Sequence, residues 1–328
     1  MAKTDKNSNA AVKIYNGYGK AENLVIYGHV LKGKYFIQRK YTRNALINII
    51  NIFRLFFIRP ISNAKVKLSW RDQNFYAITE KDGFFTFEWK PETPVLAGWH
   101  DLKVELIDEN ESISACGNGK ILVPNSTQYG FISDIDDTVL ISHSGRTHKK
   151  LWSMLTKNPR RRKTFSDVVN YYQLLSKAHT EASLPNPFFY VSSSEWNLYE
   201  YLCEFFKFNE LPDGIFLLSS IKKWYQLFKS GNTKHLTKFN RIARVLEVFP
   251  DQKFILLGDN SQSDPEVYRL ISEKYPNQIF AIYIRNINSK KEDFTEEIFK
   301  SIENKVIHTL QYIHTNEAIS HSKSVGLI

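Results

Sequence analysis

The sequence contains little cysteine: Cys116 and Cys203 are the two among 328 residues, and neither stands in a metal-binding spacing. Two cysteines do not make a disulfide framework, so we expect reduced thiols and a cytoplasmic protein. The sequence also lacks a run of eighteen uncharged apolar residues, which argues against a membrane-spanning helix. Residues 1–10 are polar and lack the apolar centre of a secretory signal, which favours the same compartment.

Acidic residues are fewer than basic ones, and the formal net charge is +10. The basic residues cluster at Arg39–Arg43 and at Arg160–Lys163. An excess of this kind favours an anionic partner such as nucleic acid, a membrane surface or a phosphorylated substrate, and does not choose among them. Because no nucleic-acid recognition motif is present, we expect no nucleic-acid partner.

The length and the 42% of hydrophobic residues predict two domains, each with its own core. Residues 11–125 are rich in β-branched and aromatic residues between turn signals, and Lys65–Trp70 and Phe85–Trp89 alternate between polar and apolar residues. This pattern predicts a β-sandwich-like domain. The predicted strands are Leu24–Leu31, Ala64–Trp70, Asn74–Thr79, Phe84–Trp89 and Leu102–Ile107.

One segment of this domain, residues 45–58, does not follow the strand pattern. It is almost wholly apolar but carries Asn48, Asn51 and Arg54 at steps of three, which on a helix would form a polar stripe. Basic residues flank it. The segment is therefore interpreted as a basic amphipathic insertion that either lies in a membrane interface or packs on the sandwich.

Residues 128–312 change to an α/β pattern, in which short apolar strands alternate with helical stretches. Such alternation indicates a parallel sheet covered on both faces. Residues 145–187, with helical character at Phe165–Ala178, are predicted to form a cap over an active site, and the chain after Ile313 is expected to be loosely structured. The five predicted strands are Gly130–Ser133, Phe188–Val191, Ile215–Leu218, Phe254–Leu257 and Ile279–Ile284.

Polar residues follow several of these strands, and ligands of open α/β sheets bind beyond the carboxyl ends of the strands. Asp134 and Asp136 follow the first strand, and Asp259 and Asp264 follow the fourth. Carboxylates this close together need a cation or a shared proton, and Mg²⁺ prefers carboxylate oxygens. Two further residues join the group: Ser192 follows the second strand, and Lys238 stands near the start of the helix before the fourth.

The order of these elements resembles the haloacid-dehalogenase superfamily over about residues 129–286. Within it, the sequence is similar to the catalytic domain of the actin-patch type of phosphatidate phosphatase. One position departs from the pattern, because that family commonly has proline where Glu195 stands. The stretches that carry the resemblance are Ser133–Val139, Tyr190–Tyr199, Lys253–Asp259, Asp264–Tyr268 and Ala281–Arg285.

The resemblance implies a fold and a set of roles. The fold would be a Rossmann-like parallel five-stranded sheet with a helical cap insertion. Asp134 would attack phosphorus and form an aspartyl-phosphate, and Asp136 would act as general acid and then general base. Mg²⁺ would be bound by Asp134, by the backbone carbonyl of Asp136 and by Asp259. Asp264 would hold waters or orient these ligands.

The remaining two positions would bind the phosphoryl group. Ser192 would donate a hydrogen bond to its oxygens, and Lys238 would balance the charge of the nucleophile and the phosphate. Ser192 is preferred to Ser193 because it directly follows the strand.

These inferences lead to a Mg²⁺-dependent phosphatase that hydrolyses phosphatidate to diacylglycerol and phosphate at a peripheral anionic membrane surface. The resemblance supplies the substrate, and the composition permits it. Two alternatives stay open: a phosphatase for a soluble phosphomonoester, and a catalytically inactive membrane or protein adaptor.

Overall fold

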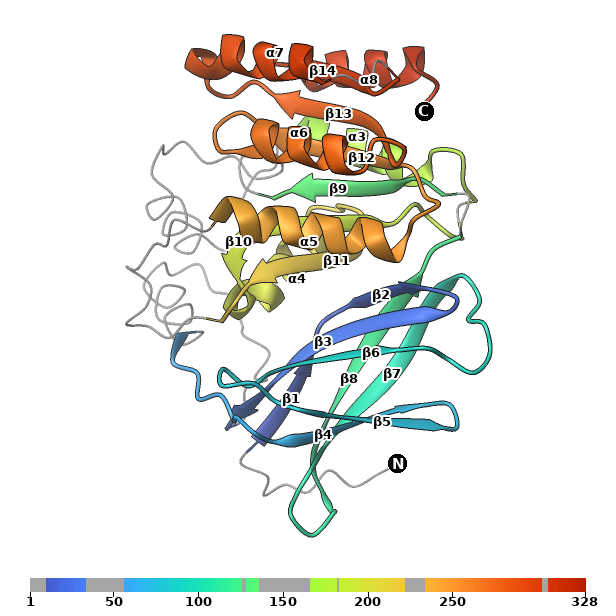
Figure 1. The fold of residues 1–328 in the computed structure, drawn as a ribbon, viewed down its shortest axis with the longest axis vertical. Coiled ribbons are helices and arrows are strands. Elements are labelled where there is room, and N and C mark those ends of the chain that lie inside the picture. The colour runs from blue at the N-terminus through green and yellow to red at the C-terminus, as the bar shows by residue number, and fades with distance from the viewer. Residues whose placement is uncertain are drawn as a thin grey trace. The chain divides into compact units, whose positions relative to one another are not determined.

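A computed structural model describes residues 10–33, 56–125, 128–135, 166–181, 183–221, 234–302 and 306–328. These residues form two compact units that divide after Asn125. In the first unit all strand pairs are antiparallel except β2 with β8, and in the second all are parallel (Figure 1). The structure thus confirms an α/β protein with a parallel sheet that follows an N-terminal antiparallel sheet.

Eight strands make up the first unit, and hydrogen bonds join them into one sheet of order β1-β3-β2-β8-β7-β4-β5, with β6 paired to β3. The ten-residue β3 makes this possible, because its length allows it to pair with β1, β2 and β6. The strands are β1 (Ala10–Ile14), β2 (Gly17–Lys20), β3 (Asn23–Lys32), β4 (Lys65–Trp70), β5 (Gln73–Ile78), β6 (Phe84–Trp89), β7 (Gly98–Ile107) and β8 (Ile113–Val123).

The core of this unit follows from the alternation in its strands. Val66, Leu68 and Trp70 of β4 are buried while the residues between them are half-exposed. The ring of Trp70 lies 5.6 Å from that of Trp89 on β6, so the two ends of the sheet face each other across one core. In the structure the predicted β-sandwich-like domain is one hydrogen-bonded, mainly antiparallel sheet of eight described strands with one core.

The second unit is built on a parallel sheet of order β11-β10-β9-β12-β13-β14. It has six strands where five were predicted. The additional strand, β14, lies at the edge and alternates polar and apolar residues, so it lacks the continuous apolar run of a buried strand. The strands are β9 (Gly130–Asp134), β10 (Phe188–Glu195), β11 (Gly214–Ser219), β12 (Phe254–Asp259), β13 (Ile279–Arg285) and β14 (His308–Tyr312).

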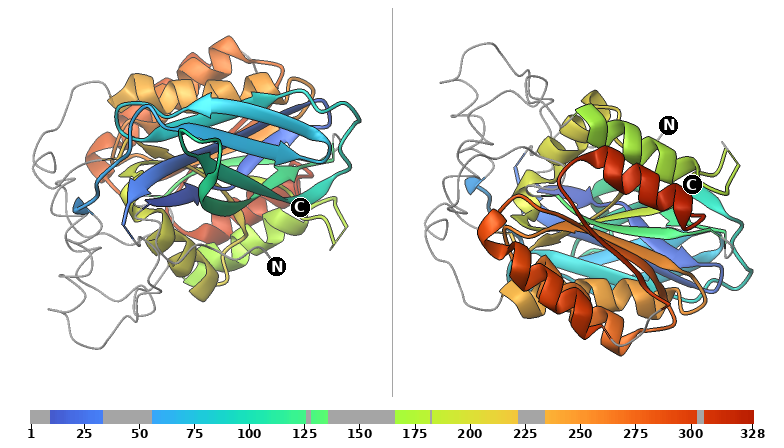
Figure 2. Two further views of the ribbon diagram at one scale, coloured as in Figure 1. Left: turned by 90° about the horizontal axis from the view of Figure 1, so that it is seen from below. Right: turned by 90° about the horizontal axis from the view of Figure 1, so that it is seen from above.

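Helices cover both faces of this sheet, with α3, α4 and α8 on one face and α5, α6 and α7 on the other (Figure 2). The chain after Ile313, expected to be loose, forms α8, whose Ser322 is fully buried. The helices are α3 (Ser166–Lys177), α4 (Tyr199–Phe208), α5 (Lys234–Val248), α6 (Asp264–Lys274), α7 (Glu292–Ser301) and α8 (Thr315–Ser324), with 3₁₀ turns at Trp196–Leu198 and Ser289–Lys291.

Side-chain alternation in β10 shows how the layers are held. Phe188 and Tyr190 point to one face, where Tyr172 of α3 and Phe206 of α4 contact them. Phe189 points to the other face, toward α5. Because α3 packs on the sheet, this part of the predicted cap is a crossover helix of the domain itself.

Several predicted features lie outside the described residues: most of the insertion 45–58, the cap residues 145–165, both basic clusters, and Asp136. For these the sequence predictions stand as predictions. Among the helices that the structure describes, none is long and apolar enough to cross a membrane.

Candidate active site

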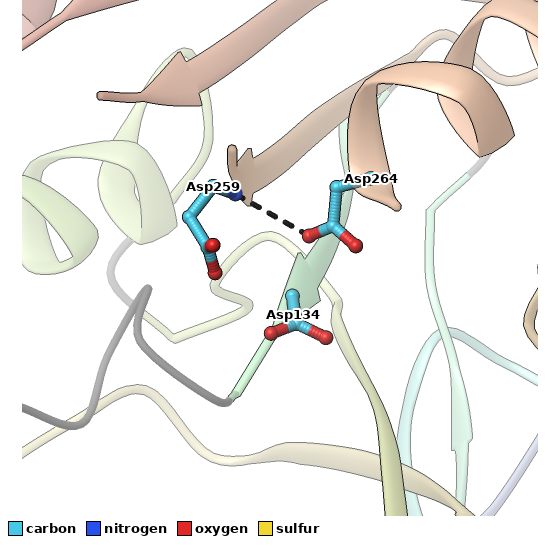
Figure 3. A group of neighbouring side chains, drawn as sticks. All are labelled: Asp134, Asp259 and Asp264. Atoms are coloured by element: carbon cyan, nitrogen blue, oxygen red, sulfur yellow. Dashed lines mark hydrogen bonds between the residues drawn. The ribbon is translucent and has the colours of Figure 1, made fainter. Parts of the chain in front are cut away.

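Three aspartates converge at the carboxyl edge of the parallel sheet (Figure 3). Asp134 is the last residue of β9 and Asp259 the last of β12, the strand hydrogen-bonded beside it. Asp264 is the first residue of α6. All three are buried, and one carboxylate oxygen from each lies within 4.8 Å of the other two.

The loop between β12 and α6 places Asp264 against the end of the strand. A Cβ at Gly258 would lie 2.5 Å from Asp264 Oδ2, so only glycine allows this approach. The backbone N–H of Asp259 donates to Asp264 Oδ2 at 3.3 Å, and that of Ser261 donates to Asp259 Oδ1 at 2.6 Å. Asp264 also stands in the first turn of α6, where the helix dipole favours a carboxylate.

Lys238 on α5 forms ion pairs with two of these carboxylates. Its ammonium donates to Asp134 Oδ1 at 2.6 Å and also to Asp264 Oδ1. Burial lowers the pKa of Lys238. The negative charges of Asp134 and Asp264, and the hydrogen bonds to them, raise that pKa by more than burial lowers it, so the pKa lies above its ordinary value. Lys238 is therefore an ammonium at neutral pH.

The charges of this cluster suit a divalent cation. Three buried carboxylates lie together here, and the ammonium of Lys238 offsets one of their charges. Without a further cation, burial and the nearby charge of Asp264 raise the pKa of Asp259 to about 6. Three carboxylates are hard oxygen ligands of the kind that Mg²⁺ prefers, so the residues present fit this ion.

Ser192 lies on β10, next to the strand that carries Asp134. The strand continues to Glu195, beyond the predicted end at Val191, and its pairing with β11 slips between these two residues. Ser192 is buried, whereas Ser193 is half-buried, and Ser192 Oγ accepts a hydrogen bond from Ser194 N at 3.0 Å.

Sequence reasoning missed Arg241, which joins two strand ends. Its guanidinium donates from Nη1 to the backbone oxygen of Ser192 at 2.8 Å and from Nη2 to Ser219 Oγ at 3.0 Å. Burial lowers the pKa of Arg241 to about 10, so it keeps its charge at neutral pH. The signal was available, because Arg241 follows Lys238 by three residues and shares its face of the helix.

Two further residues that sequence reasoning missed hold the backbone of the site. Ser133 Oγ donates to the backbone oxygen of Asp134 and shares a hydrogen bond with Tyr172 OH, both at 2.8 Å. Asn260, fully buried, accepts at Oδ1 from the N–H groups of Ile287 and Asn288, both at 2.8 Å. No sequence signal separated this serine and asparagine from ordinary turn residues.

The structure thus brings together four of the six predicted site residues: Asp134, Lys238, Asp259 and Asp264. Ser192 lies on the neighbouring strand, one residue beyond the Val191 that pairs with Asp134. Asp136 lies outside the described residues.

Comparison with known proteins gives matches to the same part of the chain. Residues 129–286 match the family described as phosphatidate phosphatase APP1, catalytic domain. Phosphatidate phosphatase APP1 of Saccharomyces cerevisiae is 32% identical over 180 residues, which are 53% of this chain and 29% of that protein. An uncharacterized protein of Schizosaccharomyces pombe is 25% identical over 164 residues, 48% of this chain and 25% of that protein.

Among solved structures, a carbohydrate acetylesterase from Xanthomonas citri aligns with 95% of this chain and 70% of its own at 10% identity, with a TM-score of 0.35. A likeness at that level supports no conclusion. The matched stretches span less than a third of the length of the curated relatives. The part of the chain that holds the aspartate cluster, residues 129–286, is thus similar to the catalytic domain of phosphatidate phosphatase APP1.

Proposed function

We propose that this protein is a Mg²⁺-dependent phosphatase that hydrolyses phosphatidate to diacylglycerol and phosphate. The observation that carries the proposal is the convergence of Asp134, Asp259, Asp264 and Lys238 at one edge of the sheet. That edge lies within the stretch similar to a protein named phosphatidate phosphatase. The pairing of β9 with β12 inside a sheet covered on both faces also supports a haloacid-dehalogenase-type domain.

Asp134 is proposed as the nucleophile. Lys238 beside Asp134 Oδ1 favours the ionised carboxylate. Attack on phosphorus forms a bond between a carboxylate oxygen and phosphorus while the ester bond to the glycerol oxygen breaks. This gives an aspartyl-phosphate, which water then hydrolyses. When bound, Mg²⁺ would supply positive charge that stabilises the transferring phosphoryl group.

Proton transfer and phosphoryl binding are assigned to the remaining residues. Asp136, two residues after the nucleophile, would protonate the leaving glycerol oxygen and then accept a proton from the attacking water. Ser192 would donate to a phosphoryl oxygen, as its position one strand away from Asp134 allows. Lys238 would offset the charge that accumulates on the phosphate.

The distribution of charge along the sequence supports a peripheral anionic membrane surface as the place of reaction. Residues 34–55, 136–165 and 222–233 hold five, eight and three basic residues, together sixteen of the chain's 44, but two of its 34 acids. The remainder of the chain therefore has more acids than bases. We accordingly propose a cytoplasmic protein that binds anionic lipid surfaces.

Phosphate release tests the proposal. Mixed micelles containing phosphatidate are compared with glycerol 3-phosphate, a sugar phosphate, a nucleotide and an aryl phosphate, each with Mg²⁺ and with excess chelator. Chelator-sensitive hydrolysis of the micellar lipid, well above that of the soluble esters, is the expected result. Faster hydrolysis of a soluble ester would replace the substrate, and no hydrolysis of any ester would favour an inactive adaptor.

A further inference from the structure

The pairing of β10 with β11 is irregular at the end of β10. Val191 pairs with Leu217, and the next pair is Glu195 with Ser219. Between these two pairs β10 advances by four residues, whereas β11 advances by two. Residues 192–194 therefore bulge out of the regular ladder. A buried backbone carbonyl in such a bulge needs a hydrogen-bond donor, because an unsatisfied carbonyl is costly.

Arg241 supplies that donor to Ser192. Its guanidinium donates 2.8 Å to the Ser192 carbonyl and 3.0 Å to Ser219 Oγ, so one planar group connects the ends of β10 and β11. The side chain of Ser192 fixes the other end of the bulge by accepting from Ser194 N at 3.0 Å. An arginine suits this task because its N–H groups diverge in a fixed plane.

The same turn of α5 also carries a residue that binds the aspartate cluster. Lys238, three residues before Arg241, donates to Asp134 Oδ1 at 2.6 Å. Positions three apart share one face of a helix, so the start of α5 sets the distance between the proposed nucleophile and the proposed phosphoryl-binding hydroxyl.

We infer that Arg241 is a positioning residue, which holds the Ser192 bulge in the geometry that binds a phosphoryl group. The inference rests on the proposed function for the role of Ser192. Arg241 acts through the backbone of Ser192 and through Ser219, and has no direct part in bond making.

The first experiment measures inhibition by inorganic phosphate and hydrolysis of the best ester from the substrate panel. In Arg241→Ala we expect the inhibition constant for phosphate and the KM each to rise about tenfold, and kcat to fall by a similar factor. Arg241→Lys keeps the positive charge but lacks the planar guanidinium with its divergent N–H groups. Relative to Arg241→Ala, it should improve the inhibition constant, KM and kcat by about threefold each. The matched control is Arg269→Ala, which removes a partly exposed arginine pairing with Glu273 on α6 and should change neither constant.

A double-mutant cycle separates positioning from general support of the fold. If Arg241 acts through Ser192, then adding Arg241→Ala to Ser192→Ala should raise the phosphate inhibition constant less than twofold further. An equal tenfold increase in both backgrounds would overturn the inference, as would unchanged constants in the single variant. Should Arg241→Ala fail to fold, Ser219→Ala removes one of the two anchors and is put through the same cycle, with an expected effect of about threefold.

Backbone hydrogen exchange gives a readout that does not depend on activity. In Arg241→Ala the amide of Ser194 should exchange at least tenfold faster, while amides of β12 keep their wild-type rates. Unchanged exchange at Ser194 would overturn the positioning role. A wild-type protein that hydrolyses no phosphoester would instead overturn the proposed function, so the two failures are distinguishable.

Discussion

The two sheets of this protein bury different kinds of side chain at different places. In the antiparallel unit the face that forms the core is apolar, with Leu24, Val66 and Val104 fully buried. In the parallel unit the strands are apolar in the middle, but fully or almost fully buried polar residues such as Asp134 and Asp259 gather at the carboxyl ends. The comparison separates the two roles that we propose for the parallel sheet: residues at its carboxyl edge carry the chemistry, and its core positions hold that edge in place.

The sharpest test of that division is Asp134→Asn. We expect turnover to fall by at least about 10⁴-fold, because an amide oxygen does not replace a carboxylate nucleophile. Stability should stay close to wild type, since the substitution also removes a charge from three clustered carboxylates. Phosphate release and thermal unfolding measure the two effects, and a variant that kept a tenth of wild-type turnover would contradict the nucleophile assignment.

The counterpart in the antiparallel unit is Leu68→Ala. Leu68 is fully buried, so its truncation should lower the free energy of unfolding by about 2–5 kcal/mol. Below the unfolding temperature its kcat should match wild type. If the core substitution abolished turnover in folded protein, the separation between scaffold and chemistry would fail.

The second prediction concerns the divalent ion and is next in size. Mg²⁺ at a hundred times its dissociation constant should raise the free energy of unfolding by about 2.7 kcal/mol. Asp259→Asn should remove most of this increase because it takes one of three carboxylates from the cluster. Thermal unfolding with and without Mg²⁺ measures it.

Asp293→Asn on the exposed side of α7 is the matched control and should respond to Mg²⁺ as wild type does. Equal Mg²⁺ responses in Asp259→Asn and in the control would place the ion elsewhere.

The pattern of apolar runs predicted most of the parallel sheet, because strands buried on both faces have continuous apolar sequence. Phe254–Asp259 and Ile279–Arg285 differ from the predicted segments by one or two residues. Edge strands do not carry that signal. The edge strand His308–Tyr312 is half-polar and was missed. In the antiparallel unit β1 and β2 were missed because they are five and four residues long, and β8 was missed because its middle is polar and contains two glycines.

The site was predictable where it used side chains in a recognisable order, as with Asp134, Asp259 and Asp264. It was not predictable where it used irregular backbone. The β10 bulge depends on pairing with β11, and the role of Arg241 depends on that bulge. The bulge leaves no pattern in the local sequence, so the spacing of Arg241 from Lys238 indicates a shared helix face and does not indicate what Arg241 binds.

The third prediction contrasts the two ends of the same sheet. In Gly258→Ala the new Cβ would lie 2.5 Å from Asp264 Oδ2 and 2.8 Å from Tyr268 Cε2, so both must move. A displacement of this size at a proposed metal-binding carboxylate should reduce kcat/KM by about a hundredfold and weaken the response to Mg²⁺.

Gly130→Ala is the control for this change. Its Cβ would lie 2.3 Å from the ring of Phe254, at the amino end of the sheet. Overpacking there should cost about 1–3 kcal/mol of stability with kcat unchanged. If both alanine variants lost activity equally, the carboxyl edge would have no special role.

The last prediction concerns the antiparallel unit, where a buried histidine makes stability depend on pH. His29 is fully buried, hydrogen-bonded at Nδ1 to Tyr15 OH at 2.8 Å, and in contact with the ring of Phe84. Burial, followed by the charge of Lys13, lowers the pKa of His29 from 6.5 to about 3. The folded state therefore keeps His29 neutral where the unfolded chain takes up a proton.

The sign follows from this difference. Between pH 6.5 and about 3 the unfolded state binds one more proton, so stability is present above pH 6.5 and falls as the pH drops. One proton corresponds to about 1.4 kcal/mol per pH unit. His29→Gln keeps an acceptor for Tyr15 and lacks the titration, so between pH 6.5 and 4.5 it should lose about 2–3 kcal/mol less stability than wild type. His100→Gln, which replaces a half-buried histidine of the same unit, is the matched control. Parallel stability curves for wild type and His29→Gln would show that His29 takes up its proton in the folded state as readily as in the unfolded chain. Burial in the antiparallel sheet would then leave the pKa of His29 unchanged, in contrast to the raised pKa of Asp259 at the edge of the parallel sheet.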